Sequence, residues 1–142
     1  MEIFQAIRKD HEKQRALMES LIETSGDSEH RKKTFEELKE QLDQHAVAEE
    51  RYFYAPLIKS DKTIDDARHG IAEHHEIEEL VDKIAETDMS SPAWLQTMKT
   101  LQERVLHHLD EEEKDFFEHA NKVLNDNQKN ELADKYLKEM QQ

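Results

Sequence analysis

Apolar residues recur along most of the chain at intervals of three and four positions, the spacing that places side chains on one face of an α-helix. Polar residues fill the intervals, and the alternating runs of Val, Ile and Thr that mark strands are absent. The pattern predicts an all-α fold, with long helices over 2–24, 28–58, 63–87 and 91–122 and a short fifth helix from about Asp126. In the fifth helix, Leu132, Tyr136 and Met140 form one stripe.

Turn and capping residues separate the predicted helices. Gly26 is the expected C′ residue after the first helix, and Pro56 is expected to disturb the last turns of the second. Thr63 is the expected N-cap of the third helix, and Ser91 followed by Pro92 is typical of a helix start. The links are too short for neighbouring helices to run parallel. We therefore expect an up-down-up-down four-helix bundle, with the fifth helix covering a bundle end or making a dimer contact.

The sequence contains an approximate internal repeat, because a shift of 63 residues lays its first half on its second without a gap. The polar residues that match under this shift are His11 with His74, His45 with His108, and Glu49 with Glu112. Apolar pairs follow the same register, Phe53 with Phe116 among them. The bundle is therefore expected to be two copies of one helical hairpin. We expect the neighbouring aromatic residues, including Tyr54 and Phe117, to pack the core and the bundle end.

The repeat decides between neighbouring histidines. His74-His75 and His107-His108 are doublets, and adjacent residues on a helix point about 100° apart. Only His74 and His108 keep the common shift, and only these two lie on the apolar stripes. We assign the other histidines to the surface or to positions behind the site: His30, His69, His75, His107 and His119.

A His and a Glu four residues apart stand on one helix face, about one turn from each other. The predicted register turns a set of such polar side chains toward the bundle axis: His11, His45, Glu49, His74, His108 and Glu112. A buried carboxylate without a partner is costly, and the stripes offer no Lys or Arg at matching depth except Arg15. Metal ions compensate such charges and accept imidazole nitrogen together with carboxylate oxygen. Two carboxylates can bridge two ions, with two histidines capping each ion. No residue is assigned a catalytic role.

Composition narrows the classes of function. The formal net charge of −14 opposes binding to nucleic acid and docking on an anionic membrane surface. Charged residues make up 38% of the chain, which makes disorder the alternative, but the ordered apolar spacing argues against it. The absence of cysteine excludes disulfides, thiolate metal ligands and iron–sulfur clusters. The chain shows no apolar run of transmembrane length and no signal-peptide pattern, so we expect a cytoplasmic protein whose 142 residues form one domain.

With these residues in place, the sequence resembles the hemerythrin-like proteins of the HHE cation-binding group. The pattern of that group is two helical hairpins, each with a His followed by His-x-x-x-Glu. The segments that carry the resemblance are Asp10-His11-Glu12, His45 to Glu50, Glu73 to Glu76, and His108 to Glu113. The resemblance extends from the first helix to the fourth. It implies a non-haem di-iron centre in which Glu49 and Glu112 bridge two iron ions, together with an oxo or hydroxo group.

One position departs from the oxygen-carrying hemerythrins, which have His-x-x-x-His on the third helix. Here Gly70 lies one turn before His74, and Glu78 lies one turn after it. One ion therefore lacks a fifth His, and we expect water, Glu78 or His69 to take its place. The departure argues against classical reversible oxygen carriage and favours a more open site.

Three functions follow from these inferences. The first is a di-iron protein that binds or senses a small ligand such as dioxygen or nitric oxide, or that handles iron. The second is a di-iron enzyme acting on peroxide or nitric oxide, and the third is a structural or storage bundle for zinc or mixed metals. The expected partners are a small diatomic molecule or peroxide, with no nucleic acid and no membrane. We expect a monomer or a weak homodimer.

Overall fold

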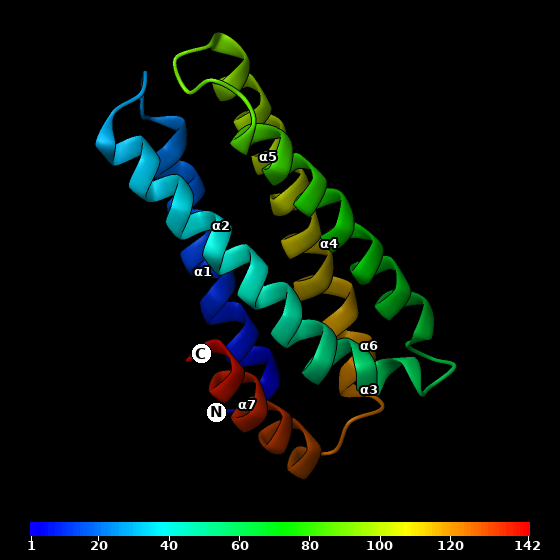
Figure 1. Ribbon diagram of the computed structural model, residues 1–142. Coiled ribbons are helices and arrows are strands. Elements are labelled where there is room, and N and C mark those ends of the chain that lie inside the picture. Colours follow the sequence, from blue (N-terminus) through cyan, green and yellow to red (C-terminus); the bar gives the residue numbers. More distant parts are fainter.

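The computed structural model describes residues 1–142, and every regular element in it is a helix. Four long helices form the bundle: α1 (Ile3–Ile22), α2 (Glu29–Glu49), α4 (Ile64–Ala85) and α5 (Pro92–Glu111). Consecutive long helices run in opposite directions, and α1 pairs with α2 as α4 pairs with α5 (Figure 1). The predicted up-down-up-down bundle of two helical hairpins is therefore confirmed.

The second and fourth helices each continue through a π-helical turn that the sequence pattern did not predict. The turn η1 (Glu50–Tyr54) leads from α2 into α3 (Ala55–Ile58). The turn η2 (Glu112–Phe116) leads from α5 into α6 (Phe117–Asn121). The second and fourth predicted helices therefore end at Ile58 and Asn121, close to the predicted ends at 58 and 122. A proline is not required for such a turn, because η2 forms without one.

A π-turn contains one more residue than an α-turn and so brings an additional side chain to the inner face. After Glu49, both Phe53 and Tyr54 are fully buried. In the second half, Phe116 and Phe117 are likewise both buried. The widened turns thus place two adjacent aromatic residues of each half in the interior, just beyond the His-x-x-x-Glu segment.

Side-chain caps define three of the predicted helix starts. Ser28 and Ser91 each accept a hydrogen bond from a backbone amide in the first turn of α2 and α5. Asn125 and Gln128 form a reciprocal capping box at the start of α7 (Asp126–Met140). These short polar side chains satisfy amides that a helix start leaves without partners.

One local prediction is confirmed in position and another is wrong. Thr63 is the N-cap of α4, as expected, but its side chain makes no capping bond. Its hydroxyl instead donates to the Leu57 carbonyl at 2.7 Å and links the start of α4 to α3. Gly26 lies beyond Glu23, the C-cap of α1, and takes a left-handed conformation (φ +63°) within the link to α2.

A layer of polar residues divides the apolar core into two clusters. One cluster fills the end of the bundle near α7 and includes Ile7 and Phe53. The other fills the opposite half and includes Met18 and Leu101. On α1 the first cluster ends at Ile7 and the second begins at Met18, with His11 between them. The polar layer is therefore closed off by apolar packing at both ends.

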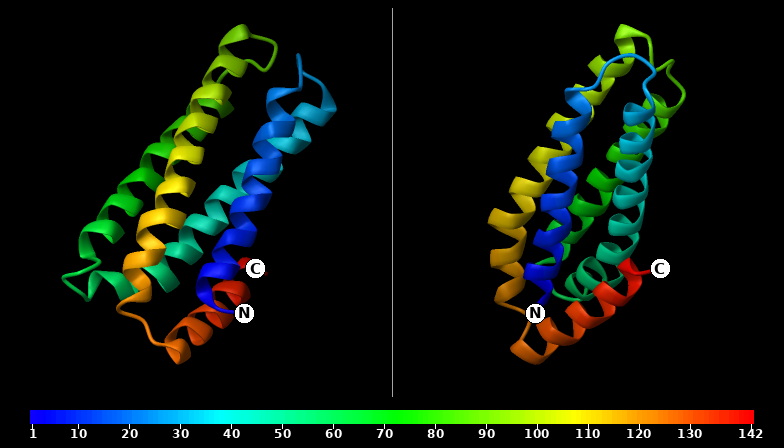
Figure 2. Two further views of the ribbon diagram at one scale, coloured as in Figure 1. Left: turned by 180° about the vertical axis from the view of Figure 1, so that it is seen from behind. Right: turned by 90° about the vertical axis from the view of Figure 1, so that its left-hand side faces the viewer.

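Helix α7 crosses the bundle end at which the N-terminus lies, and it packs on α1 and α2 (Figure 2). Its predicted stripe faces inward, since Tyr136 is fully buried and Leu132 and Met140 are partly buried. The fifth helix thus covers one bundle end, which is the first of the two roles expected for it. None of the helices has the length and apolar character needed to cross a membrane.

Candidate metal centre

The bundle brings the predicted polar residues together in the layer between the two apolar clusters. All are buried, and His11, Glu49 and Glu112 have no exposed surface. Their side-chain donor atoms fall into two groups that share Glu49: His11, His45, Glu49 and Glu112 in the first, and Glu49, His74 and His108 in the second.

The Glu49 carboxylate faces both hairpins. Its Oε2 lies 3.4 Å from His45 Nε2 in the first hairpin. Its Oε1 lies 2.9 Å from His74 Nε2 in the second. One oxygen is therefore directed at each histidine pair.

The Glu112 carboxylate repeats this arrangement from the second hairpin. Its Oε1 lies 3.1 Å from His11 Nε2, and its Oε2 lies 3.5 Å from His108 Nε2. Both carboxylates thus lie between a histidine pair of the first hairpin and a histidine pair of the second. This arrangement suits two cations that are bridged by two carboxylates.

The outer nitrogen of three imidazoles is held by a carboxylate. The Nδ1 distances are 2.6 Å to Glu113 for His11, 2.8 Å to Glu50 for His74, and 2.7 Å to Glu73 for His108. A carboxylate that accepts a hydrogen bond from Nδ1–H favours the tautomer with its proton on Nδ1 and leaves the inner Nε2 with a free lone pair. The surroundings of each ring therefore orient a ligand nitrogen toward the centre of the layer.

The fourth imidazole, His45, is held through a tyrosine of α7. His45 Nδ1 lies 2.5 Å from Tyr136 Oη, and the Tyr136 hydroxyl donates to Asp10. Gln41 donates to the other Asp10 oxygen at 3.2 Å. Helix α7 therefore orients a site residue as well as covering the bundle end, which the stripe pattern alone did not indicate.

The inner atoms of the layer lack hydrogen-bond partners. The four imidazole Nε2 atoms, both Glu49 oxygens and Glu112 Oε1 are buried without one. A lone pair that faces a buried carboxylate oxygen is repelled by it unless a cation lies between them. Imidazole nitrogen and carboxylate oxygen are ligands of divalent transition metals, so these residues fit a metal centre.

Protons can supply the same positive charge when no metal is bound. Burial opposes protonation of His45, but the carboxylates of Glu49, Asp10 and Glu112 together outweigh it and raise the pKa of His45 to about 10. Burial also opposes protonation of His74, but the adjacent carboxylates of Glu49 and Glu50 raise the pKa of His74 to about 9. Burial and the charge of Glu49 raise the pKa of Glu112. A metal ion that binds here therefore displaces protons.

Tyr54 is the functional candidate that the sequence analysis missed, because it was expected only to pack the core. Its side chain is fully buried, and its hydroxyl donates to Glu112 Oε2. Burial and the nearby charge of Glu112 raise the pKa of Tyr54. The ring occupies the space beside Gly70, where an added Cβ would overlap Tyr54 Cζ and Oη. The place left by the missing fifth His is thus taken by Tyr54.

The internal repeat contained a signal for this exchange. Under the 63-residue shift, Gly70 matches Ile7 and Tyr54 matches Phe117. Beside His11, the large Ile7 and the Phe117 ring lie in one apolar cluster, and that ring stacks toward His11 at 6.4 Å between centroids. Only the pair beside His74 therefore combines a missing side chain on one helix with a phenol on another.

The two residues proposed as replacements for the fifth His lie outside the buried groups. His69 is half exposed, and its Nε2 lies 2.8 Å from Glu111 on the outer side of α4 and α5. Glu78 is exposed. The rejected doublet members, His75 and His107, are 73% and 68% exposed. Burial therefore agrees with the register chosen from the repeat.

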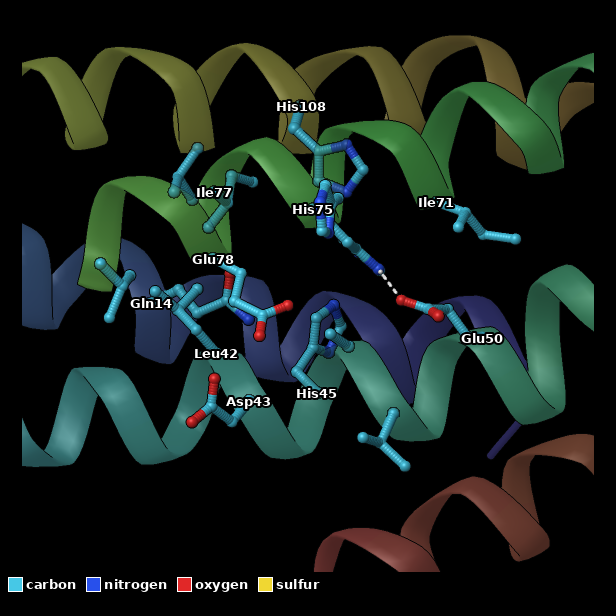
Figure 3. A pocket seen from close by; sticks show the side chains of 15 residues that line it. Gln14, Leu42, Asp43, His45, Glu50, Ile71, His75, Ile77, Glu78 and His108 are labelled. Carbon is cyan, nitrogen blue, oxygen red and sulfur yellow. Dashed lines mark hydrogen bonds and ion pairs between the residues drawn. The ribbon is translucent and has the colours of Figure 1, made fainter. Parts of the chain in front are cut away.

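One side of the polar layer is accessible from solvent. A pocket of about 370 Å³ opens between α2 and α4 and reaches His45, His74 and His108 (Figure 3). Arg15, the one cation expected near the stripes, lies outside the layer and pairs with Glu113 at 2.9 Å. No Lys or Arg side chain lines the pocket.

Comparison with known proteins gives two matches. Residues 2–120 match the family model of the hemerythrin HHE cation binding domain. No curated protein matches the chain. A solved structure, that of a hemerythrin HHE cation binding domain-containing protein from Mycobacterium kansasii, is 25% identical, with a TM-score of 0.88. The alignment covers 99% of this chain and 86% of that one, so the similarity includes the fifth helix.

Replacing Gly70 by alanine tests the close approach of Tyr54. The added Cβ would overlap the Tyr54 ring and force it to move. We expect the free energy of unfolding to fall by about 1–3 kcal/mol, although alanine favours a helix over glycine by about 1 kcal/mol. In a Tyr54→Ala background the same change should stabilise the protein instead. Urea denaturation of the four proteins measures both effects, and the same sign in both backgrounds would contradict the contact.

Proposed function

We propose that this chain, which belongs to the hemerythrin HHE cation-binding domain family, binds two iron ions and, at them, a small neutral ligand such as dioxygen or nitric oxide. His11 and His45 would hold one ion, and His74 and His108 the other. Glu49 and Glu112 would bridge the pair. The family makes the protein a metal-binding one; the identity and number of the ions, and the ligand, are the proposal.

The observation that carries this proposal is the set of inner atoms without partners. Every imidazole of the layer turns Nε2 inward, and its other nitrogen is held from outside. The carboxylates offer one oxygen to each histidine pair. Buried polar atoms that are oriented toward one another without hydrogen bonds are stable only with bound positive charge.

The donor set favours iron. Thiolates are absent, and imidazole, carboxylate and phenol oxygen together are ligands that iron accepts in both common oxidation states. Tyr54 would add an oxygen donor to the ion held by His74 and His108, because its hydroxyl already lies against the Glu112 oxygen on that side. The two ions would therefore differ in their ligands.

The pocket between α2 and α4 favours a function that involves a second molecule. Structural zinc sites are closed by their four protein ligands. Here a path from solvent reaches three of the histidines, and its walls include Leu42, Ile71 and Val105. Such walls suit a small neutral molecule. This access is the reason to prefer ligand binding over a purely structural metal site.

Metal analysis of protein purified without chelator tests the ligand set. We expect about two iron ions per chain in the unaltered protein. His45→Ala and Glu112→Ala should each retain less than half of that metal and unfold at a lower temperature, because a bound ion stabilises the folded state.

His107→Ala is the matched control, because His107 also lies four residues before a glutamate but is exposed. It should keep both ions and the unaltered melting temperature. Loss of metal in His107→Ala with full retention in His45→Ala would contradict the proposed ligands. An unaltered protein that is folded and free of metal would contradict the centre itself.

Tyr54→Phe tests the proposed oxygen donor. A phenolate bound to ferric iron absorbs visible light, so the oxidised protein should show a visible band that Tyr54→Phe loses while it keeps its metal. Tyr136→Phe is the control, because Tyr136 is equally buried but lies against His45 Nδ1, outside the inner layer. A band that survives in Tyr54→Phe, or that disappears only in Tyr136→Phe, would show that Tyr54 is not a ligand.

Adding a ligand to the reduced protein distinguishes binding from turnover. We expect dioxygen or nitric oxide to produce a stoichiometric spectral change that is reversed when the gas is removed. Sustained consumption of excess peroxide or nitric oxide would instead identify an enzyme and would contradict a purely ligand-binding role.

A further inference from the structure

The pocket between α2 and α4 carries acidic side chains at its solvent side. Asp43 projects from α2 and Glu78 from the facing helix α4, and Glu50 lies farther along the pocket (Figure 3). Asp43 and Glu78 are exposed, and Glu50 is partly exposed. None of the residues that line the pocket is Lys or Arg. We name Asp43, Glu50 and Glu78 the acidic rim.

The acidic rim leads directly to the inner layer. Glu50 accepts from His74 Nδ1 at 2.8 Å, so the rim touches the outer edge of a site histidine. Deeper in the pocket lie His45 and His108, from helices on either side. A molecule that enters from solvent between α2 and α4 therefore passes the rim before it reaches the imidazoles.

The other sides of the layer are occupied by paired groups. Between α1 and α5, Glu113 is held by both His11 and Arg15. Toward α7, Tyr136 and Asp10 are hydrogen-bonded to each other. These contacts occupy two other approaches to the layer, whereas the pocket between α2 and α4 is lined by site histidines.

We infer that this pocket is the loading route for divalent cations, and that the acidic rim attracts cations to the centre and holds back anions. The inference rests on the proposed metal centre and adds to it a selection by charge. Neutral diatomic molecules would pass the rim without a penalty, whereas an anion would have to approach three carboxylates.

The physical basis is electrostatic focusing. A cleft lined by charges of one sign raises the local concentration of opposite ions and accelerates their association. The charge of Lys39 acts on Asp43 from one turn earlier on α2, but the Lys39 side chain does not line the pocket. The effect is screened by salt, because the Debye length is about 10 Å at 0.1 M ionic strength and about 3 Å at 1 M.

The test compares two double variants that remove the same net charge. The rim variant is Asp43→Asn with Glu78→Gln, which keeps the shape of the side chains. The control is Glu76→Gln with Glu79→Gln, which changes the outer face of α4, where both residues are more than half exposed. Glu50 is left intact, because it also positions His74.

Stopped-flow mixing of metal-free protein with Co²⁺ at low salt gives the loading rate. We expect the rate of the rim variant to fall about fivefold relative to the unaltered protein, within the range of steering effects, and the control to remain unchanged. At high salt the three rates should converge. The final Co²⁺ content should be the same in all three proteins.

A second measurement uses an anionic probe on the iron-loaded proteins. Azide should bind to the rim variant about fivefold faster than to the unaltered protein or the control at low salt, whereas the rate of nitric oxide binding should not change. The contrast between a charged and a neutral probe distinguishes charge selection from a wider opening, which would accelerate both.

Two results would overturn the inference. Equal Co²⁺ loading in all three proteins would show that the rim does not steer cations. A lower final Co²⁺ content in the rim variant alone would make Glu78 or Asp43 a ligand and not a rim residue. If the unaltered protein holds no metal at all, the proposed function fails, and that outcome is distinct from both.

Discussion

Two carboxylates, Glu49 and Glu112, lie fully buried at the middle of this bundle, and the rest of the site follows from that constraint. Buried negative charges that face one another are strongly unfavourable unless positive charge is placed between them. The chain surrounds them with imidazoles and not with Lys or Arg. A protonated imidazole can release its proton and bind a metal ion with the same nitrogen. A buried Lys or Arg would instead keep its own positive charge next to the carboxylates and leave no room for a metal ion.

The groups bound to the outer nitrogens of the imidazoles hold the rings in the orientation that the buried carboxylates require. Glu50, Glu73 and Glu113 each hold the outer nitrogen of one ring, and Tyr136 holds the fourth. Such partners fix the orientation of a ligand and increase its basicity. The high share of acidic residues in the chain is thus partly explained by this second ring of carboxylates.

Most of the fold could be predicted from the sequence, because the apolar spacing and the caps act locally. The choice of His74 over His75 could also be predicted, because the 63-residue repeat matches His11 with His74 and not with His75. The π-turns could not be predicted, since neither η1 nor η2 contains a proline or glycine. Tyr54 was missed for that reason: without a π-turn, the inner position after Glu49 would be Phe53 alone.

The repeat is also the source of the most informative difference between the two halves. Gly70 and Tyr54 replace Ile7 and Phe117, so only one histidine pair gains a phenol oxygen. The residue that fills the place of a missing side chain comes from another helical segment, η1, and not from α4 itself. Spacing along one helix, which supported the choice of Glu78 or His69, contains no information about such a contact.

The central claim is that Glu49 and Glu112 share two metal ions. Anomalous diffraction from crystals of the iron-containing protein, recorded at the iron absorption edge, tests it most directly. The account predicts two anomalous peaks between these carboxylates, one beside His11 and His45 and one beside His74 and His108. It would be contradicted by a folded protein with no peak in this layer, or with a single peak at the exposed group of His69, Glu73 and Glu111.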